Sequence, residues 1–111
     1  MKINHQDYNN VTVVELGGEF VEEYCKAFQD TMTELIKKQR SGIVLDMSKV
    51  PFIDSSGLGM LLWLRDYCHE NKSQLKLAGL DGNITKILEV TRLDSKLDRY
   101  EELSEAVKSF T

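Results

Sequence analysis

The sequence predicts a small α/β domain in which helices cover a mostly parallel β-sheet. Segments rich in β-branched residues alternate with segments whose apolar residues recur every three or four positions. Strands that alternate with helices are joined by right-handed crossovers, which make their sheet largely parallel. The chain has 111 residues, 41% of them apolar and 29% charged, which is enough for one compact core. We therefore expect residues 1–111 to form a single domain with about four helices.

The first strands are predicted close to the beginning of the chain. Residues 11–16, VTVVEL, are rich in β-branched side chains and lie between two asparagines and two glycines, which favour turns. Residues 2–6 form a weaker extended segment, which we expect to pair with them as an antiparallel hairpin at the edge of the sheet. Residues 21–39 then carry apolar side chains at the spacing of an amphipathic helix, which a Ser-Gly pair ends.

The middle of the chain predicts a buried strand followed by a strongly apolar helix. Residues 43–47, IVLDM, are apolar at nearly every position, as in a strand that is covered on both faces. The next helix is expected from about residue 55 to 71. We expect its core face to hold Leu58, Leu61, Leu62 and either the stem of Arg65 or Cys68. On another face, a second stripe is either covered by neighbouring helices or binds a partner: Met60, Trp63 and Tyr67.

Four shorter elements complete the prediction. Residues 73–79 form a strand, residues 83–92 a helix, residues 96–100 a brief strand and residues 101–110 a closing helix. Each of the two helices aligns its apolar side chains on one face. The order of elements places the carboxyl ends of the strands at one edge of the sheet, where α/β proteins tend to carry their sites.

Charge and hydropathy exclude two classes of partner. Fourteen basic and eighteen acidic residues leave a net charge of −4, which repels the phosphate backbone of nucleic acids. The chain begins without an apolar leader segment, and its longest apolar run, residues 58–64, is too short to span a bilayer. We expect a cytoplasmic protein without nucleic-acid binding or direct membrane insertion.

The cysteines and histidines predict no metal site and no cofactor. Cys25 and Cys68 are far apart in sequence and lie in helical patterns, so we expect free thiols unless the fold brings them together. His69 has no second ligand at a spacing that suits a metal ion, and it is expected to be solvated.

The stretch PFIDSSGLG, residues 51–59, is the most informative part of the sequence. Asp54 and Ser55 are both good N-caps for the helix that follows. Gly57 and Gly59 lie in the first turns of that helix, where each costs roughly 1 kcal/mol relative to alanine. Bare backbone at these positions indicates either tight packing on a neighbouring strand or the close approach of another molecule.

Three kinds of chemistry can be compared for this turn. A serine nucleophile needs an adjacent base, and the two histidines, His5 and His69, are both distant in the predicted fold, so we expect no enzyme. A phosphate-binding cradle is disfavoured because residues 50–64 contain no lysine or arginine and Asp54 repels anions. A serine that itself receives a phosphate fits better, since about −1.5 to −2 charge would alter any contact made there.

The segments IVLDM, SKVPFIDSSGLGML and KILEVTRLD resemble the STAS fold, and specifically bacterial anti-sigma-factor antagonists, over essentially the whole chain. The resemblance implies that Ser55, the first serine after the aspartate, is phosphorylated by a serine-kinase anti-sigma factor. A PP2C-type serine phosphatase would remove the phosphate. The unphosphorylated protein would bind the kinase, and the phosphorylated protein would release it. Ser56 is the weaker candidate for the acceptor.

The resemblance also implies a partner-binding surface around the acceptor. Family members often carry an acid after the Gly-acid-apolar trio that ends the second strand. Here Gly18-Glu19-Phe20 is followed by Val21, which leaves any kinase contact of that acid open, although Glu22 and Glu23 are close in sequence. We expect the surface to comprise Glu19, Asp54, Ser56, Gly57, Leu58, Gly59, Met60 and Trp63.

Two further hypotheses follow from the same residues. The chain could be a STAS regulatory subunit of a membrane transport complex that is never phosphorylated, with the Asp-Ser-Ser-Gly turn serving only as a helix cap. The patch around Trp63 could also pair with itself and form a weak homodimer.

Overall fold

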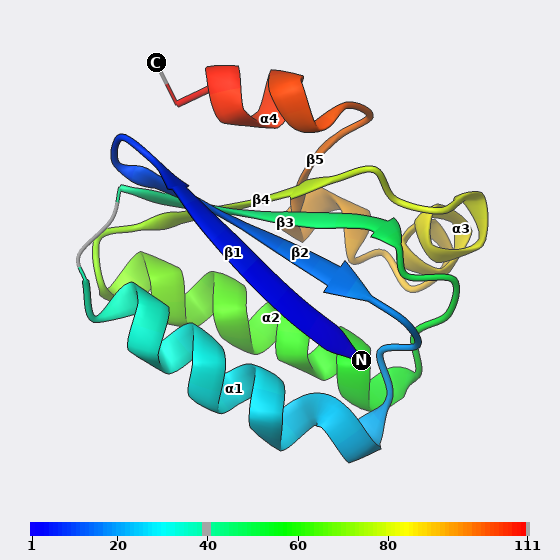
Figure 1. Ribbon diagram of the computed structural model, residues 1–111. Coiled ribbons are helices and arrows are strands. Elements are labelled where there is room, and N and C mark those ends of the chain that lie inside the picture. Colours follow the sequence, from blue (N-terminus) through cyan, green and yellow to red (C-terminus); the bar gives the residue numbers. More distant parts are fainter. Residues whose placement is uncertain (39–40, 111) are drawn as a thin grey trace.

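The computed structural model describes residues 1–38 and 41–110, which form a five-stranded mixed sheet and four α-helices (Figure 1). The sheet has the order β1-β2-β3-β4-β5, with β1 and β2 antiparallel and all other neighbours parallel. The strands are β1 (Lys2–Tyr8), β2 (Val11–Gly17), β3 (Gly42–Lys49), β4 (Gln74–Ala78) and β5 (Asp98–Tyr100). The helices are α1 (Glu22–Ile36), α2 (Ser55–Glu70), α3 (Gly82–Val90) and α4 (Leu103–Lys108), with a 3₁₀ turn at Asp94–Lys96. The predicted fold class and the antiparallel edge hairpin are confirmed.

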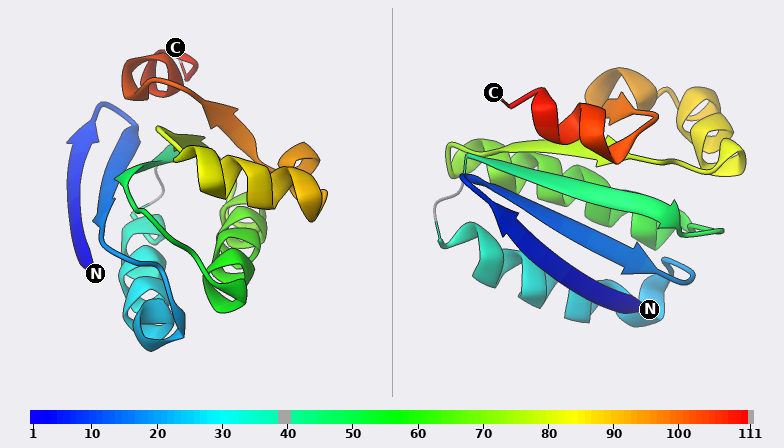
Figure 2. Two further views of the ribbon diagram at one scale, coloured as in Figure 1. Left: turned by 90° about the vertical axis from the view of Figure 1, so that its right-hand side faces the viewer. Right: turned by 45° about the horizontal axis from the view of Figure 1, so that its top comes forward.

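The helices divide the molecule into layers. Both α1 and α2 lie side by side against one face of the sheet, whereas α4 lies on the opposite face (Figure 2). α3 lies beyond the end of the sheet toward which β3 and β4 run (Figure 1). This arrangement leaves the loops at the carboxyl ends of β2 and β3 together, at the point where α1 and α2 begin.

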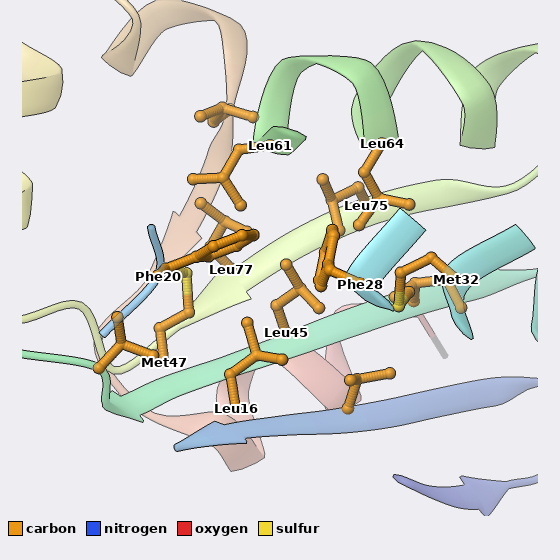
Figure 3. Close-up of a cluster of buried hydrophobic side chains, with 14 of the residues drawn as sticks. Leu16, Phe20, Phe28, Met32, Leu45, Met47, Leu61, Leu64, Leu75 and Leu77 are labelled. Carbon is orange, nitrogen blue, oxygen red and sulfur yellow. The ribbon is translucent and has the colours of Figure 1, made fainter. Parts of the chain in front are cut away.

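The main core lies between the sheet and the pair α1 and α2 (Figure 3). The rings of Phe20 and Phe28 pack at 4.8 Å between centroids, and both side chains are fully buried. Each such side chain stabilises the fold by roughly 1.5–3 kcal/mol relative to leaving it in water. The sheet residues Leu16, Leu45 and Leu77 complete this layer. The buried Phe20 fixes the β2–α1 connection, and hence one wall of the site described below.

The buried stripe of α2 differs from the predicted one. Leu61 and Cys68 are buried as expected, but Leu64 fills the position predicted for Leu62, which is only half-buried. Leu58 is half-buried and packs against the core. Of the two alternatives Arg65 and Cys68, Cys68 is the buried one, so Leu62 is the part of the predicted core face that was wrong. The buried residues at 57, 61, 64 and 68 follow a single helical stripe. Because α2 is apolar around most of its circumference, composition alone did not identify that stripe.

Element boundaries differ at several helix and strand ends. α1 starts at Glu22 because Val21 has extended backbone, and it ends at Ile36 instead of continuing to residue 39, which lies outside the described residues. β5 begins at Asp98, because Lys96, which was predicted to open this strand, belongs to the 3₁₀ turn. Both cysteines are free, as predicted. Burial raises the pKa of the Cys68 thiol to about 12.

Substitution of Leu64 and Leu62 tests which side of α2 is the core side. Leu64→Ala should lower the free energy of unfolding by about 2–5 kcal/mol, because it leaves a cavity under a fully buried side chain. Leu62→Ala removes the same atoms from a half-buried position and should cost clearly less. Urea denaturation followed by circular dichroism measures both. Equal losses would contradict the observed orientation of the helix.

Candidate functional site

The Asp54 carboxylate caps two helices at once. Its Oδ1 accepts a hydrogen bond from the backbone N–H of Gly57 at 2.8 Å, at the start of α2. Its Oδ2 accepts a second one from the backbone N–H of Glu22 at 3.1 Å, at the start of α1. Unpaired N–H groups at helix starts need such acceptors, and a carboxylate also suits the positive end of each helix dipole. Of the two candidate N-caps, Asp54 and Ser55, it is Asp54 that caps α2. The same side chain also links the β2–α1 and β3–α2 connections, which are distant in sequence.

Backbone hydrogen bonds hold the same two connections together. The N–H of Phe20 donates to the carbonyl of Phe52 at 2.9 Å, and the N–H of Asp54 donates to the carbonyl of Phe20 at 3.2 Å. Phe20 and Ile53 thus form a short parallel bridge beyond the ends of β2 and β3. These backbone hydrogen bonds and the Asp54 cap together hold the turn before α2 in place.

The two glycines of the turn have different environments. Gly57 is buried, and a Cβ added there would lie 2.5 Å from the carbonyl oxygen of Phe20 and 2.6 Å from Cγ1 of Ile53. The absence of a side chain at this position is required by packing. Gly57 is also one of the predicted partner-binding residues, and its burial gives it a packing role within the chain. Gly59 is exposed, and a Cβ there would meet nothing within 4 Å. Packing within the chain therefore does not account for this second glycine.

The two serines are placed differently at the start of α2. Ser55 is exposed and Ser56 is half-buried. Within residues 1–38 and 41–110, neither hydroxyl makes a hydrogen bond, and the helix cap is made by Asp54. The Ser55 oxygen is therefore accessible from solvent and not engaged elsewhere.

The surroundings of the turn are negatively charged on the α1 side. Glu19 is exposed in the β2–α1 connection, and Glu22 and Glu23 are exposed in the first turn of α1. The pKa of the half-buried Cys25 thiol is raised, first by burial and then by the nearby Asp54 and Glu22 carboxylates. Residues 50–64 include no lysine or arginine. An anion added at Ser55 would thus find acidic neighbours on this side.

The remaining predicted surface residues lie along α2. Leu58, Met60 and Trp63 are half-buried and pack against the edge of the main core. The rings of Trp63 and Tyr67 stack at 5.1 Å between centroids, with 14° between their planes. Part of each side chain packs against the core, and part remains accessible to solvent.

Two exposed apolar side chains that the sequence pattern did not single out also lie near the turn. Phe52, in the loop before Asp54, is 48% exposed, and Val90, at the end of α3, is 75% exposed. A phenylalanine placed next to a proline, outside any predicted element, was the available signal for the first. For the second, the signal was the periodicity of α3, which leaves Val90 off the face that holds Ile84 and Leu88.

The described part of the chain holds neither a metal-binding cluster nor a membrane-spanning helix. No group of three or more histidine, cysteine, aspartate or glutamate side chains there could hold a metal ion. No helix of residues 1–38 and 41–110 is both long and apolar enough to cross a membrane.

Comparison with known proteins identifies the family of this chain. The STAS domain model matches residues 2–106. The chain belongs to the STAS domain family. It is 37% identical over 51 residues to a STAS-domain containing protein of Pseudomonas aeruginosa, a match that covers 46% of this chain and 50% of that relative's length. It is 24% identical over 94 residues to the anti-sigma F factor antagonist of Paenibacillus polymyxa, covering 84% of this chain and 80% of that one.

The STAS fold is also shared with SpoIIAA of Bacillus, the cell fate determinant, in its phosphorylated form. That structure superimposes with a TM-score of 0.75 and 16% sequence identity, covering 99% of this chain and 100% of SpoIIAA. At this identity the likeness concerns the fold alone. What the two chains share is the overall arrangement of the mixed sheet and its helices.

Replacing Asp54 tests the double cap. Asp54→Ala should lower the free energy of unfolding by about 1–3 kcal/mol, because two helix starts each lose an acceptor. Asp81 offers a matched control, since its Oδ1 caps only α3 through the N–H of Asn83 at 2.8 Å. Asp81→Ala should cost about 0.5–2 kcal/mol. If the Asp54 variant loses no more stability than the Asp81 variant, the second cap contributes nothing.

The two glycines of the turn should respond to alanine in opposite directions. Gly57→Ala should destabilise the protein by about 1–3 kcal/mol, because its Cβ would press on the Phe20 carbonyl. Gly59→Ala should stabilise it by up to about 1 kcal/mol, because the position is open and alanine favours the helix. Thermal unfolding measures both. A destabilised Gly59 variant would show that packing does constrain this position.

Proposed function

We propose that this chain is an anti-sigma-factor antagonist that works by partner switching, with Ser55 as its phosphate acceptor. The observation that carries this assignment is the exposed, unengaged Ser55 hydroxyl on the first residue of α2, beside the doubly engaged Asp54. The likeness to an anti-sigma F factor antagonist supports the regulatory role. The phosphorylated form of SpoIIAA supports the choice of a modification over catalysis.

In the proposed transfer, a serine-kinase anti-sigma factor supplies ATP and a base. The Ser55 oxygen attacks the γ-phosphorus of ATP, the new O–P bond forms, and the bond to ADP breaks. The hydroxyl proton passes to the kinase, because both Asp54 oxygens already accept backbone hydrogen bonds. A PP2C-type phosphatase reverses the modification by hydrolysis. Ser56, which is half-buried, offers less access to a kinase active site.

The phosphate would act on the interface by its charge. It adds about −1.5 to −2 charge at pH 7, next to Glu19, Glu22 and Asp54, with no cation among residues 50–64 to neutralise it. The α2 dipole offsets only about 0.3–1 kcal/mol of this at an exposed site. Burying the group against a partner then carries a desolvation cost, so the complex dissociates. Gly59, which packing within the chain does not explain, lets the partner's backbone approach α2 closely.

The acceptor is tested by labelling with the serine-kinase anti-sigma factor of the same organism. Wild type and Ser56→Ala should each gain one phosphate, and Ser55→Ala should gain none, as measured by intact mass and site mapping. The folded state of each variant is checked by circular dichroism. Undiminished labelling of Ser55→Ala would exclude this residue as the acceptor.

The switch itself is tested by affinity for the same kinase. Ser55→Asp should weaken binding by roughly tenfold or more, because it places a charge in the interface. Ser104→Asp, at another exposed serine in the first turn of a helix, should leave affinity unchanged. Isothermal titration calorimetry measures both. Stable binding to a transport ATPase that ignores Ser55→Asp would instead identify a constitutive STAS subunit.

A further inference from the structure

A groove lies between the loop before α2 and the outer side of α3. Its volume is about 540 Å³. Most of its lining is apolar: Pro51, Phe52, Ile84, Ile87 and Val90, together with Asn83, Lys86 and Thr91. Three large hydrophobic residues are exposed in the described part of the chain, and two of them, Phe52 and Val90, line this groove. Apolar side chains gathered in this way mark binding surfaces more often than those scattered singly.

Packing of the domain leaves this groove uncovered. α3 contributes Ile84 and Leu88 to the main core, and both are fully buried. Val90, at the last position of α3, extends away from that core and is 75% exposed. α3 lies beyond the end of the sheet, and neither α1, α2 nor α4 crosses its outer side (Figures 1 and 2).

The groove is continuous with the turn that carries Ser55. Phe52 stands three residues before Ser55, and its carbonyl accepts the hydrogen bond from the N–H of Phe20 at 2.9 Å. The backbone of Phe52 is therefore fixed, while its ring is 48% exposed. A partner that covers Ser55 from the α3 side must also meet this ring.

The surface on the two sides of Ser55 differs in charge. Lys86 is its only charged lining residue, and Lys86 makes no ion pair within residues 1–38 and 41–110. On the other side of Ser55, Glu19, Glu22 and Glu23 are acidic and exposed. The surface around the acceptor is thus acidic toward α1, and apolar with one lysine toward α3. A complementary partner is basic where it faces α1, and apolar with a carboxylate where it faces α3.

We propose, building on the partner-switching function above, that this groove binds a segment of the anti-sigma factor in which a bulky apolar side chain stands next to an acidic one. The apolar side chain enters between Phe52 and Val90, and the carboxylate pairs with Lys86. Binding in the groove contributes affinity for the anti-sigma factor that does not depend on Ser55. A phosphate on Ser55, in the adjacent turn, lowers the affinity of the same complex.

The experiment compares affinities for the purified serine-kinase anti-sigma factor by isothermal titration calorimetry. Phe52→Ala, Val90→Glu and Lys86→Glu should each weaken binding by roughly tenfold, the effect of losing an anchoring contact at an interface. The matched controls lie away from the groove and should bind as the wild type does. They are Tyr8→Ala, which removes an equally exposed aromatic ring (49%) from β1, and Lys72→Glu, just beyond the far end of α2. Thermal unfolding confirms that each variant is folded.

Three outcomes would overturn the groove assignment, and they separate it from the switch. If wild type binds and Ser55→Asp does not, but all three groove variants bind normally, the switch stands and the groove has no part in it. If the groove variants change only self-association, measured by sedimentation of the protein alone, the occupant is a second copy of the chain. If wild type neither binds the kinase nor accepts phosphate, the partner-switching function fails and the groove assignment fails with it.

Discussion

One carboxylate holds the functional end of this domain in place. Asp54 accepts backbone hydrogen bonds from the first turns of both α1 and α2, at 3.1 Å and 2.8 Å, so the two helices that cover the sheet begin at a shared point. Parallel strands bring their carboxyl ends to the same edge, which is why loops 32 residues apart can meet there. The burial of Phe20 between them depends on the same arrangement. The backbone that carries Ser55 is therefore already held in place in the free domain.

Among the residues that follow Asp54, some are packed within the domain and others are open to solvent. Gly57 is closed in by the Phe20 carbonyl, whereas Gly59, two residues later, has open space where a side chain would be. Ser56 is half-buried and Ser55 is exposed. Because the cap is made by an aspartate, the following serine does not have to make it. The turn thus keeps a hydroxyl and a stretch of bare backbone in solvent without loss of local structure.

Local pattern was enough to predict the order of the elements, but not the contacts between them. The β-branched run of β2, the apolar run of β3 and the helical spacing of α1 are properties of neighbouring residues, so they could be identified from the sequence. The choice between Leu62 and Leu64 could not, because α2 is apolar on several sides and only the packed sheet selects one. The hydrogen bond between Asp54 and the N–H of Glu22 joins segments that are distant in sequence, so no local pattern could predict it. These features arise from tertiary structure.

The hydrogen bonds of Asp54 also determine what the proposed phosphorylation would change. In the described residues neither serine hydroxyl has a hydrogen bond to lose, and both oxygens of Asp54 bind backbone N–H groups that phosphate does not need to displace. A phosphate on Ser55 would therefore change the charge of the surface without removing a contact that holds the domain together. The effect must then appear in the partner's affinity, because a ligand or modification shifts only those equilibria whose states it contacts differently. A rigid turn with an exposed acceptor suits a switch of this kind better than a flexible loop, in which the added charge could move away from the interface.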